Sequence, residues 1–349
     1  MELTFLIIIL AVVTVVVFDF TNGFHDTANI IAPIIASRAM TPIQSVFLVA
    51  FFEFLGPIFG GTAVANTIGS FVSLSDFKEL NAVTVLISGL MAAVTWNLVT
   101  WKWGIPSSSS HALVGGLIGA VLISAGGDHV VWGFQQLMLG ELTGVTKVII
   151  ALIFSPLIGF WVGFFLQKTM MFLLRSAKPS INKSLKKSQI ITAAGLAFSH
   201  GTNDAQKSMG VLTLILLLGG QISQFIVPLW VILLCASAIT LGVILGGWRI
   251  VKTLGFSIYK IRPIHAFNTQ ISAITVIFSA SMLGAPVSTT HVVSSAIMGI
   301  GSAERYKAVK WQKAKEMLQT WVVTIPVTSL LAIIIYSILN VLLLTHSTT

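Results

Sequence analysis

Two aspartates in matching sequence contexts are the residues of this chain best suited to bind a cation. Asp26 lies in the run 23–29 (GFHDTAN) and Asp204 lies in the run 201–207 (GTNDAQK), and both runs interrupt apolar stretches. A carboxylate at bilayer depth costs at least ~2.5 kcal/mol and usually marks an ion or substrate path. A helix cap at a kink is the alternative, because Asp and Asn favour caps. The duplication favours a functional pair. Since Gly23 and Gly201 precede the aspartates by three residues, we expect the helices to unwind there and to offer carbonyls to the cation.

Clusters of hydroxyl side chains follow two prolines, Pro106 and Pro286, at nearly equal distances after the two aspartates. Proline stops one helix, and the next helix can begin there with free N–H groups. Such a helix start with added hydroxyl donors is an anion site. Ordinary N-capping by Ser108 or Ser288 explains one hydroxyl in each cluster but not the others. A tetrahedral oxyanion would use several converging donors, which we expect to be Ser108, Ser109, Ser110, Ser288, Thr289 and Thr290.

Carboxylates beside an anion site imply a coupling cation. The repulsion between close charges amounts to several kcal/mol even at an effective dielectric constant of ~20, and a bound cation or proton would remove it. A cation-coupled oxyanion symporter is therefore favoured over a channel or an anion exchanger. Phosphate is favoured over sulfate, because phosphate at neutral pH can carry a proton and donate it in a hydrogen bond to a carboxylate. Sulfate stays the closest alternative.

Composition places these residues in a membrane. Of 349 residues, 9% are charged and 55% are hydrophobic, and the mean hydropathy is +0.95. Soluble domains carry about 25% charged residues, so a soluble globule is excluded. We predict an all-α polytopic membrane protein with about ten membrane-inserted segments. The short apolar pieces at 27–38, 108–125, 207–219 and 290–303 are expected to be halves of broken helices or re-entrant hairpins.

The distribution of charge predicts the topology. Basic residues crowd 175–187, 249–262 and 305–315, whereas loops 72–81 and 126–146 carry acidic residues and few basic ones. The positive-inside rule makes the first three cytoplasmic and the last two external, with both termini outside. The net charge of +9 therefore belongs to membrane-flanking loops, and no nucleic-acid partner is expected.

Loops at corresponding places in the two halves of the chain fall on opposite sides of the membrane. This arrangement predicts two inverted-topology repeats, 1–175 and 189–349, joined by a basic cytoplasmic linker at 176–188. Such repeats are typical of secondary transporters, whose substrate lies near the midplane.

The paired motifs resemble those of the inorganic phosphate transporter family, often called PiT, over nearly the whole chain. The resemblance implies symport of inorganic phosphate with sodium ions or protons, while some bacterial relatives carry a neutral metal–phosphate complex. It also implies a transporter rather than an enzyme, with no resident cofactor, in a bacterial plasma membrane, where homodimers are plausible. Carried onto this sequence, it places phosphate and cations at Asp26, Asn29, Asn203 and Asp204, together with the six hydroxyl residues named above.

Three further residues complete the predicted site. His25 stands where sodium-coupled relatives commonly have Asn; an imidazole can relay protons or bind a metal, which favours protons or metal–phosphate over sodium. The alternative is a neutral His that hydrogen-bonds as Asn would. Lys207 contacts phosphate or forms a structural ion pair with Asp204. Glu53, in the middle of an apolar segment, is a cation or gating residue or a buried hydrogen-bonded acid.

His111 and His291 support rival functions. They could ligate haem or a metal in a membrane redox protein, or His111 could serve Ser109 or Ser110 in an intramembrane hydrolase. Neither scheme explains the duplicated aspartates. The sequence contains no nucleophile elbow for a hydrolase and no Walker A motif for an ATP-driven pump.

Overall fold

The computed structural model describes residues 2–74, 79–246, 248–256 and 258–347. These residues form thirteen α-helices and two 3-10 helices and contain no β-strand, which confirms the all-α prediction. The α-helices are α1 (Glu2–Ala36), α2 (Pro42–Phe59), α3 (Ala63–Gly69), α4 (Glu79–Trp103), α5 (Ser109–Ser124), α6 (Phe134–Met138), α7 (Gly144–Leu173), α8 (Ile181–Leu218), α9 (Leu229–Leu245), α10 (Trp248–Phe256), α11 (Pro263–Met282), α12 (Thr289–Arg305) and α13 (Trp311–Ser347).

Long apolar helices make this a multi-pass membrane protein. Five described helices, α1, α2, α4, α7 and α13, are long and apolar enough to cross a bilayer, and a sixth span is possible if α9 and α10 act as one bent span. Large apolar side chains such as Phe47 (71% exposed) and Ile191 (77% exposed) cover the outside of the bundle. In water such a surface would be unfavourable, whereas in lipid it is the expected one.

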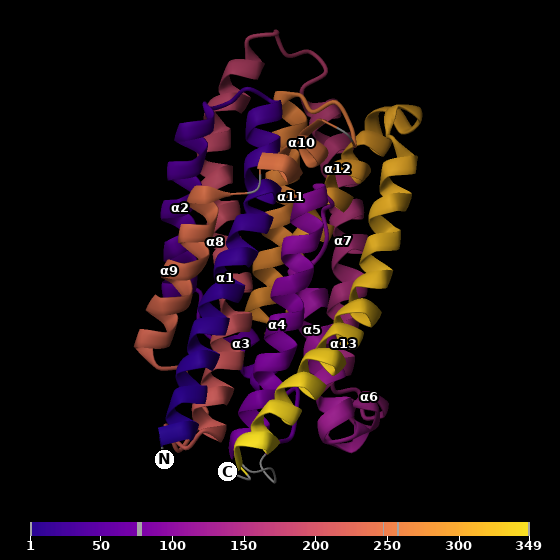
Figure 1. Ribbon diagram of the computed structural model, residues 1–349. Coiled ribbons are helices and arrows are strands. Elements are labelled where there is room, and N and C mark those ends of the chain that lie inside the picture. Colours follow the sequence, from indigo (N-terminus) through magenta and orange to yellow (C-terminus); the bar gives the residue numbers. More distant parts are fainter. Residues whose placement is uncertain (1, 75–78, 247, 257, 348–349) are drawn as a thin grey trace.

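Both termini lie at one end of the bundle, and the connection between α7 and α8 lies at the other (Figure 1). The short helix α6, within the acidic loop 126–146, shares the end that holds the termini. This arrangement agrees with the grouping predicted from charge, and the assignment of each end to a side of the membrane stays a prediction. Residues 75–78 of the loop 72–81 and residue 257 of the loop 249–262 lie outside the described residues.

The two halves of the chain pack in corresponding ways. Helix α1 packs against α9 as α8 packs against α2, and α5 packs against α13 as α12 packs against α7. Helices α4 and α5 contact each other as α11 and α12 do. The order of elements and their partners thus follow the duplication seen in the sequence. The inverted relation between the halves stays a prediction.

The predicted breaks at the two aspartates are wrong. Helix α1 runs without interruption through residues 23–29, and α8 runs without interruption through residues 201–207. The pieces 27–38 and 207–219 are therefore parts of these long helices rather than separate half-helices. Backbone carbonyls here stay in helical hydrogen bonds, so any cation between the aspartates must be held by side chains.

The glycines serve close helix packing instead of unwinding. A Cβ atom added to Gly23 would lie 2.1 Å from the Ile239 carbonyl oxygen, and one added to Gly201 would lie 2.3 Å from the Glu53 carbonyl oxygen. Small residues let backbones approach where membrane helices cross. Each glycine therefore fixes the crossing that brings its aspartate to the centre of the bundle.

The predicted breaks at the two prolines are confirmed. Helix α4 ends at Trp103 before α5 begins at Ser109, and α11 ends at Met282 before α12 begins at Thr289. Gly104 and Gly284, each two residues before a proline, have φ values of +64° and +65°. Only glycine adopts this left-handed conformation without strain, so the same turn is encoded twice.

The connection between the two halves ends earlier than the predicted linker 176–188. Helix α7 ends at Leu173 and α8 begins at Ile181, so residues 181–188 of the predicted linker form the first two turns of α8. The basic side chains of this stretch consequently extend from a helix.

Candidate functional site

The predicted site residues of both halves meet in the centre of the bundle. The segments of α1 and α8 that carry the two aspartates face the first turns of α5 and α12. These first turns contribute hydroxyl side chains. Six of these residues are each at most 3% exposed: Asp26, Ser109, Ser110, Asp204, Thr289 and Thr290. The site is thus closed to solvent from both ends of the molecule.

Asp26 is surrounded by hydrogen-bond donors from both halves. Thr290 donates to its Oδ1 at 2.9 Å, and Ser109 donates to its Oδ2 at 3.0 Å. The Nδ1 atom of His25 lies 2.9 Å from the same Oδ1. Asn29, one helical turn further on, donates to Thr290 at 2.9 Å. The first carboxylate is therefore held by an imidazole and by hydroxyls of both helix starts.

Asp204 is held mainly by a cation. The Nζ atom of Lys207 lies 2.5 Å from its Oδ1, and Thr289 donates to its Oδ2 at 3.4 Å. Lys207 also donates to Ser110 at 2.6 Å and to the Val287 carbonyl at 3.1 Å. The two predicted roles of Lys207 are therefore compatible, because its ammonium group joins Asp204 to the hydroxyl cluster.

His200 belongs to the site and was not predicted. Its Nδ1 lies 2.6 Å from Oε1 of Glu53, and its Nε2 lies 3.3 Å from Oδ2 of Asp204 without forming a hydrogen bond. Ligand atoms of Asp26, His200 and Asp204 all lie within 4.8 Å of one another, so these residues could hold a cation. Its position four residues before Asp204, on the same helix face, was the signal that could have identified it.

The serines that begin α5 and α12 act as helix caps. The Ser108 hydroxyl accepts from the His111 amide at 3.1 Å, and the Ser288 hydroxyl accepts from the His291 amide at 3.3 Å. The capping interpretation therefore holds for these two residues. Among the following residues, Ser109, Thr289 and Thr290 donate their hydroxyls to the two aspartates. Ser110 instead accepts from Lys207 and donates to the Val287 carbonyl at 3.0 Å.

Two predicted residues lie at the margin of the site. The Nε2 atom of His25 lies 3.3 Å from the Thr100 hydroxyl and 3.4 Å from the Ser107 hydroxyl, so its ring connects Asp26 to α4. Asn203 donates to Ser281 of α11 at 3.0 Å and so points away from the hydroxyl cluster.

Several buried acceptor atoms have no hydrogen-bond partner. Some lie elsewhere in the bundle, such as Oδ2 of Asp19 and Oδ1 of Asn22; those of the predicted site residues are Oδ1 of Asn29, Oδ1 of Asn203 and Oε2 of Glu53. Leaving a buried polar atom unpaired costs about 1–3 kcal/mol. All three are acceptors, which a cation or the proton of a bound ligand would satisfy.

The two histidines behind the helix starts pack on each other. The rings of His111 and His291 have centroids 4.6 Å apart, and His291 stacks on Trp321 at 3.8 Å. Rings in direct contact leave no room for a haem between them, so the geometry gives no support to the redox alternative.

Comparisons with known proteins identify the family of this chain. Residues 22–332 match the phosphate transporter family. A probable low-affinity inorganic phosphate transporter of Bacillus subtilis is 41% identical over 98% of this chain and 100% of its own length. A protein of the same description from Rhizobium meliloti is 40% identical over 91% of this chain and 92% of its own length.

A solved structure described as the sodium-dependent phosphate transporter has the same fold. It is similar with a TM-score of 0.81 over 96% of this chain and 99% of its own, at 24% sequence identity. At that identity the likeness establishes the arrangement of the helices and leaves the chemistry to the residues themselves.

Proposed function

The chain belongs to the phosphate transporter family, and we propose that it is a secondary transporter that imports inorganic phosphate in symport with a cation. The observation that carries this proposal is the convergence of hydroxyl groups from two helix starts on two buried carboxylates. Sulfate or another tetrahedral oxyanion is the alternative substrate.

We propose that phosphate binds among the hydroxyls and Lys207. Ser109, Thr289 and Thr290 offer hydroxyl donors. The Lys207 ammonium is a further donor; it contacts Ser110, whose own hydroxyl donates to the Val287 carbonyl. The capping serines, Ser108 and Ser288, support the ligand by fixing the helix starts. A protonated phosphate would in addition donate to an unpaired acceptor beside the cluster, Oδ1 of Asn29.

We propose that the coupling cation occupies the space between Asp26, His200 and Asp204. An imidazole ligand suits a proton or a divalent transition metal, whereas hard cations prefer oxygen alone. The geometry therefore supports a proton or a metal–phosphate complex. Sodium stays possible because the protein of similar fold is described as sodium-dependent. Glu53 and His25 lie around the cation site and would relay protons or position its ligands.

Transport requires the closed site to open to each side in turn. We propose that the halves 1–175 and 189–349 are inverted repeats that rock against each other in a bacterial plasma membrane, as monomers or within a homodimer. The termini would then lie outside and the linker inside, in accordance with the positive-inside rule.

Uptake by purified protein in liposomes tests this function. Radiolabelled phosphate should accumulate, and excess sulfate should compete poorly. Imposed proton and sodium gradients and a chelator of divalent metals then identify the coupling species. Ser109→Ala should reduce uptake, while Ser124→Ala on the same helix should not, because the Ser124 hydroxyl bonds only its own helix, to Ala120 and Val121. Uptake of sulfate without uptake of phosphate would reverse the assignment.

A further inference from the structure

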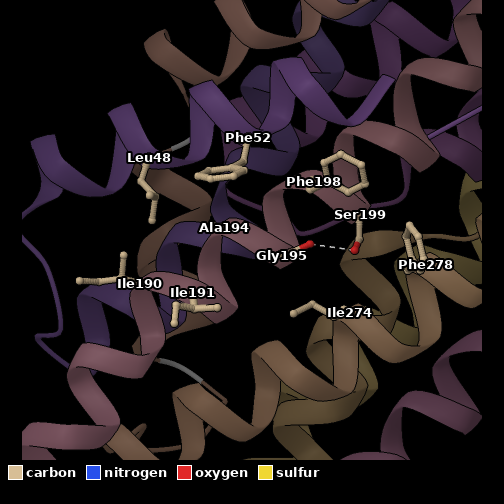
Figure 2. A pocket seen from close by; sticks show the side chains of 10 residues that line it. All are labelled: Leu48, Phe52, Ile190, Ile191, Ala194, Gly195, Phe198, Ser199, Ile274 and Phe278. Carbon is tan, nitrogen blue, oxygen red and sulfur yellow. Dashed lines mark hydrogen bonds between the residues drawn. The ribbon is translucent and has the colours of Figure 1, made fainter. Parts of the chain in front are cut away.

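An apolar groove lies on the outside of the bundle, and no charged side chain from the described part of the chain lines it. It runs between α2, α8 and α11 with a volume of about 550 Å³ (Figure 2). Phe52 of α2 and Phe278 of α11 flank it. Helix α8 contributes Ile190, Ile191, Ala194, Gly195, Phe198 and Ser199. Its one side-chain hydroxyl, on Ser199, donates to the Gly195 carbonyl at 2.8 Å. The groove therefore offers an occupant apolar contact alone.

A basic hollow precedes the groove along α8, at the end of the bundle that holds the α7–α8 connection. Lys178, Lys183 and Lys187 line it, together with Ser180 and Ser184, and its volume is about 440 Å³. None of the three ammonium groups lies within ion-pair distance of a carboxylate among the described residues. No Asp or Glu occurs between Glu141 and Asp204 in the sequence. Within the part of the chain that the structure describes, the three lysines of this hollow therefore have no carboxylate partner.

The hollow and the groove share one face of α8. Lys183, Lys187, Ile191, Ala194 and Phe198 follow one another at intervals of three or four residues, which places them on the same side of the helix. From Ile190 to Ser199 the groove extends about 14 Å at ~1.5 Å per residue, which is about half of the ~30 Å hydrocarbon core. Basic groups at the membrane surface followed by an apolar channel one leaflet deep match the two parts of a phospholipid.

We propose that this face of α8 binds one anionic phospholipid, with its phosphate headgroup in the basic hollow and one acyl chain in the groove. Clusters of Lys and Arg at the cytoplasmic end of membrane helices attract anionic lipid headgroups. Charge complementarity selects this occupant over a second copy of the chain. A symmetric contact between two copies at this face would place two unneutralised lysine clusters against each other.

Lipid retention by the purified full-length protein in neutral detergent tests the proposal. The probes are dioleoylphosphatidylglycerol, dioleoylphosphatidylcholine and glycerol 3-phosphate, with bound lipid counted by native mass spectrometry and melting temperature followed in parallel. One phosphatidylglycerol molecule should bind at least ~10-fold more tightly than phosphatidylcholine. Glycerol 3-phosphate, which has the headgroup charge but no acyl chain, should not reproduce the effect.

Two variants separate the hollow from the groove. The triple variant Lys178→Gln/Lys183→Gln/Lys187→Gln should lose the preference for phosphatidylglycerol. A matched triple variant in the basic stretch 305–315, Lys307→Gln/Lys310→Gln/Lys315→Gln, should keep it. Gly195→Leu, which fills the groove, should weaken retention of phosphatidylglycerol; its melting temperature in detergent without lipid reports whether the variant has folded.

Three outcomes would overturn the proposal. They are equal retention of the two phospholipids, equal loss in both triple variants, and unchanged retention in a folded Gly195→Leu protein. A change of oligomeric state in that variant, with lipid retention unchanged, would identify a second copy of the chain as the occupant instead. An effect of glycerol 3-phosphate or inorganic phosphate that survives the Lys178/Lys183/Lys187 substitutions would belong to the transport site.

Discussion

The two halves of the molecule place different charges on the same scaffold. Asp26 and Asp204 occupy corresponding positions, and each accepts from the hydroxyl that begins the short helix of its own half, Ser109 at 3.0 Å and Thr289 at 3.4 Å. Three residues after each aspartate, Asn29 donates to Thr290 and Lys207 donates to Ser110, which are again corresponding positions. These two pairs of hydrogen bonds are thus duplicated while the charges of the groups are not.

The difference lies in which groups neutralise the carboxylates. Asp26 has His25 beside it, where the second half has Asn203; Asp204 has Lys207 and His200, where the first half has Asn29 and Asn22. The ammonium group of Lys207 already pairs with Asp204 at 2.5 Å. The charge of Asp26 depends on an imidazole or on a bound cation, which makes the first half the one suited to respond to the coupling ion.

The largest expected effect comes from removing either carboxylate. Asp26→Asn and Asp204→Asn should each abolish concentrative uptake of phosphate in proteoliposomes, since each removes a ligand of the proposed cation site. Both variants should still insert, because loss of a membrane charge lowers the cost of insertion. Normal accumulation in both variants would defeat the two-carboxylate mechanism.

Stability should distinguish the two substitutions. Asp204→Asn leaves the buried ammonium of Lys207 unpaired, which costs about 3–5 kcal/mol in a buried pair. Asp26→Asn leaves no permanent cation behind and should lower the melting temperature less. The double variant Asp204→Asn/Lys207→Gln should recover the melting temperature without recovering uptake. Equal melting temperatures for the two single variants would contradict the asymmetry.

His200 provides the next test, because it is the proposed ligand that has no counterpart in the first half. His200→Asn introduces the residue type that the first half has at the corresponding position, Asn22. Phosphate uptake should fall about tenfold or more, and any dependence of uptake on divalent metals should disappear. It also removes the 2.6 Å partner of Glu53, and an unpaired buried acid costs about 1–3 kcal/mol. Adding Glu53→Gln should restore stability but not uptake. His129→Asn, in a loop near α6, is the control.

The reasons why the sequence predicted some of this site and not the rest are physical. Duplicated motifs identified Asp26, Asp204 and the hydroxyl clusters, because both halves keep those residue types. The duplicated motifs do not identify His200, because the corresponding residue of the first half is Asn22. Gly23 and Gly201 were interpreted as points of unwinding, since sequence cannot separate a glycine that breaks a helix from one that admits a neighbouring backbone. The direction of the Asn203 side chain, toward Ser281, depends on the position of α11 and has no local signal.

His25 tests the coupling ion with a smaller expected effect. His25→Asn makes the first half match Asn203 of the second. If the imidazole relays protons, the variant should respond less to an imposed pH gradient while binding phosphate as before. If sodium is the coupling ion, uptake driven by a sodium gradient should survive the substitution. An unchanged response to the pH gradient would remove His25 from the proton path.

The smallest expected effect concerns stability alone, at an ion cluster that only the second half carries. Glu304, at the end of α12 and outside the long spanning helices, lies with its Oε2 2.5 Å from Nε2 of His265 and pairs with Arg262. The corresponding residue of the first half is Ser124, whose hydroxyl bonds its own helix. The hydrogen bond from His265, with the Arg262 contact, lowers the pKa of Glu304 from 4.5 to about 2.

A carboxyl whose pKa is lowered by folding stabilises the protein above its unfolded pKa. For Glu304 this contribution is present above about pH 4.5 and is lost as the pH falls toward about 2. Because the side chain is 21% exposed and solvent screens the pair, we expect at most ~1 kcal/mol. Melting temperatures in detergent between pH 6 and pH 3 should therefore fall less steeply for Glu304→Gln than for the wild type. Glu316→Gln, which breaks an exposed pair with Lys313, should follow the wild-type slope, and a Glu304→Gln profile parallel to the wild type would show that this cluster stores no pH-dependent stability.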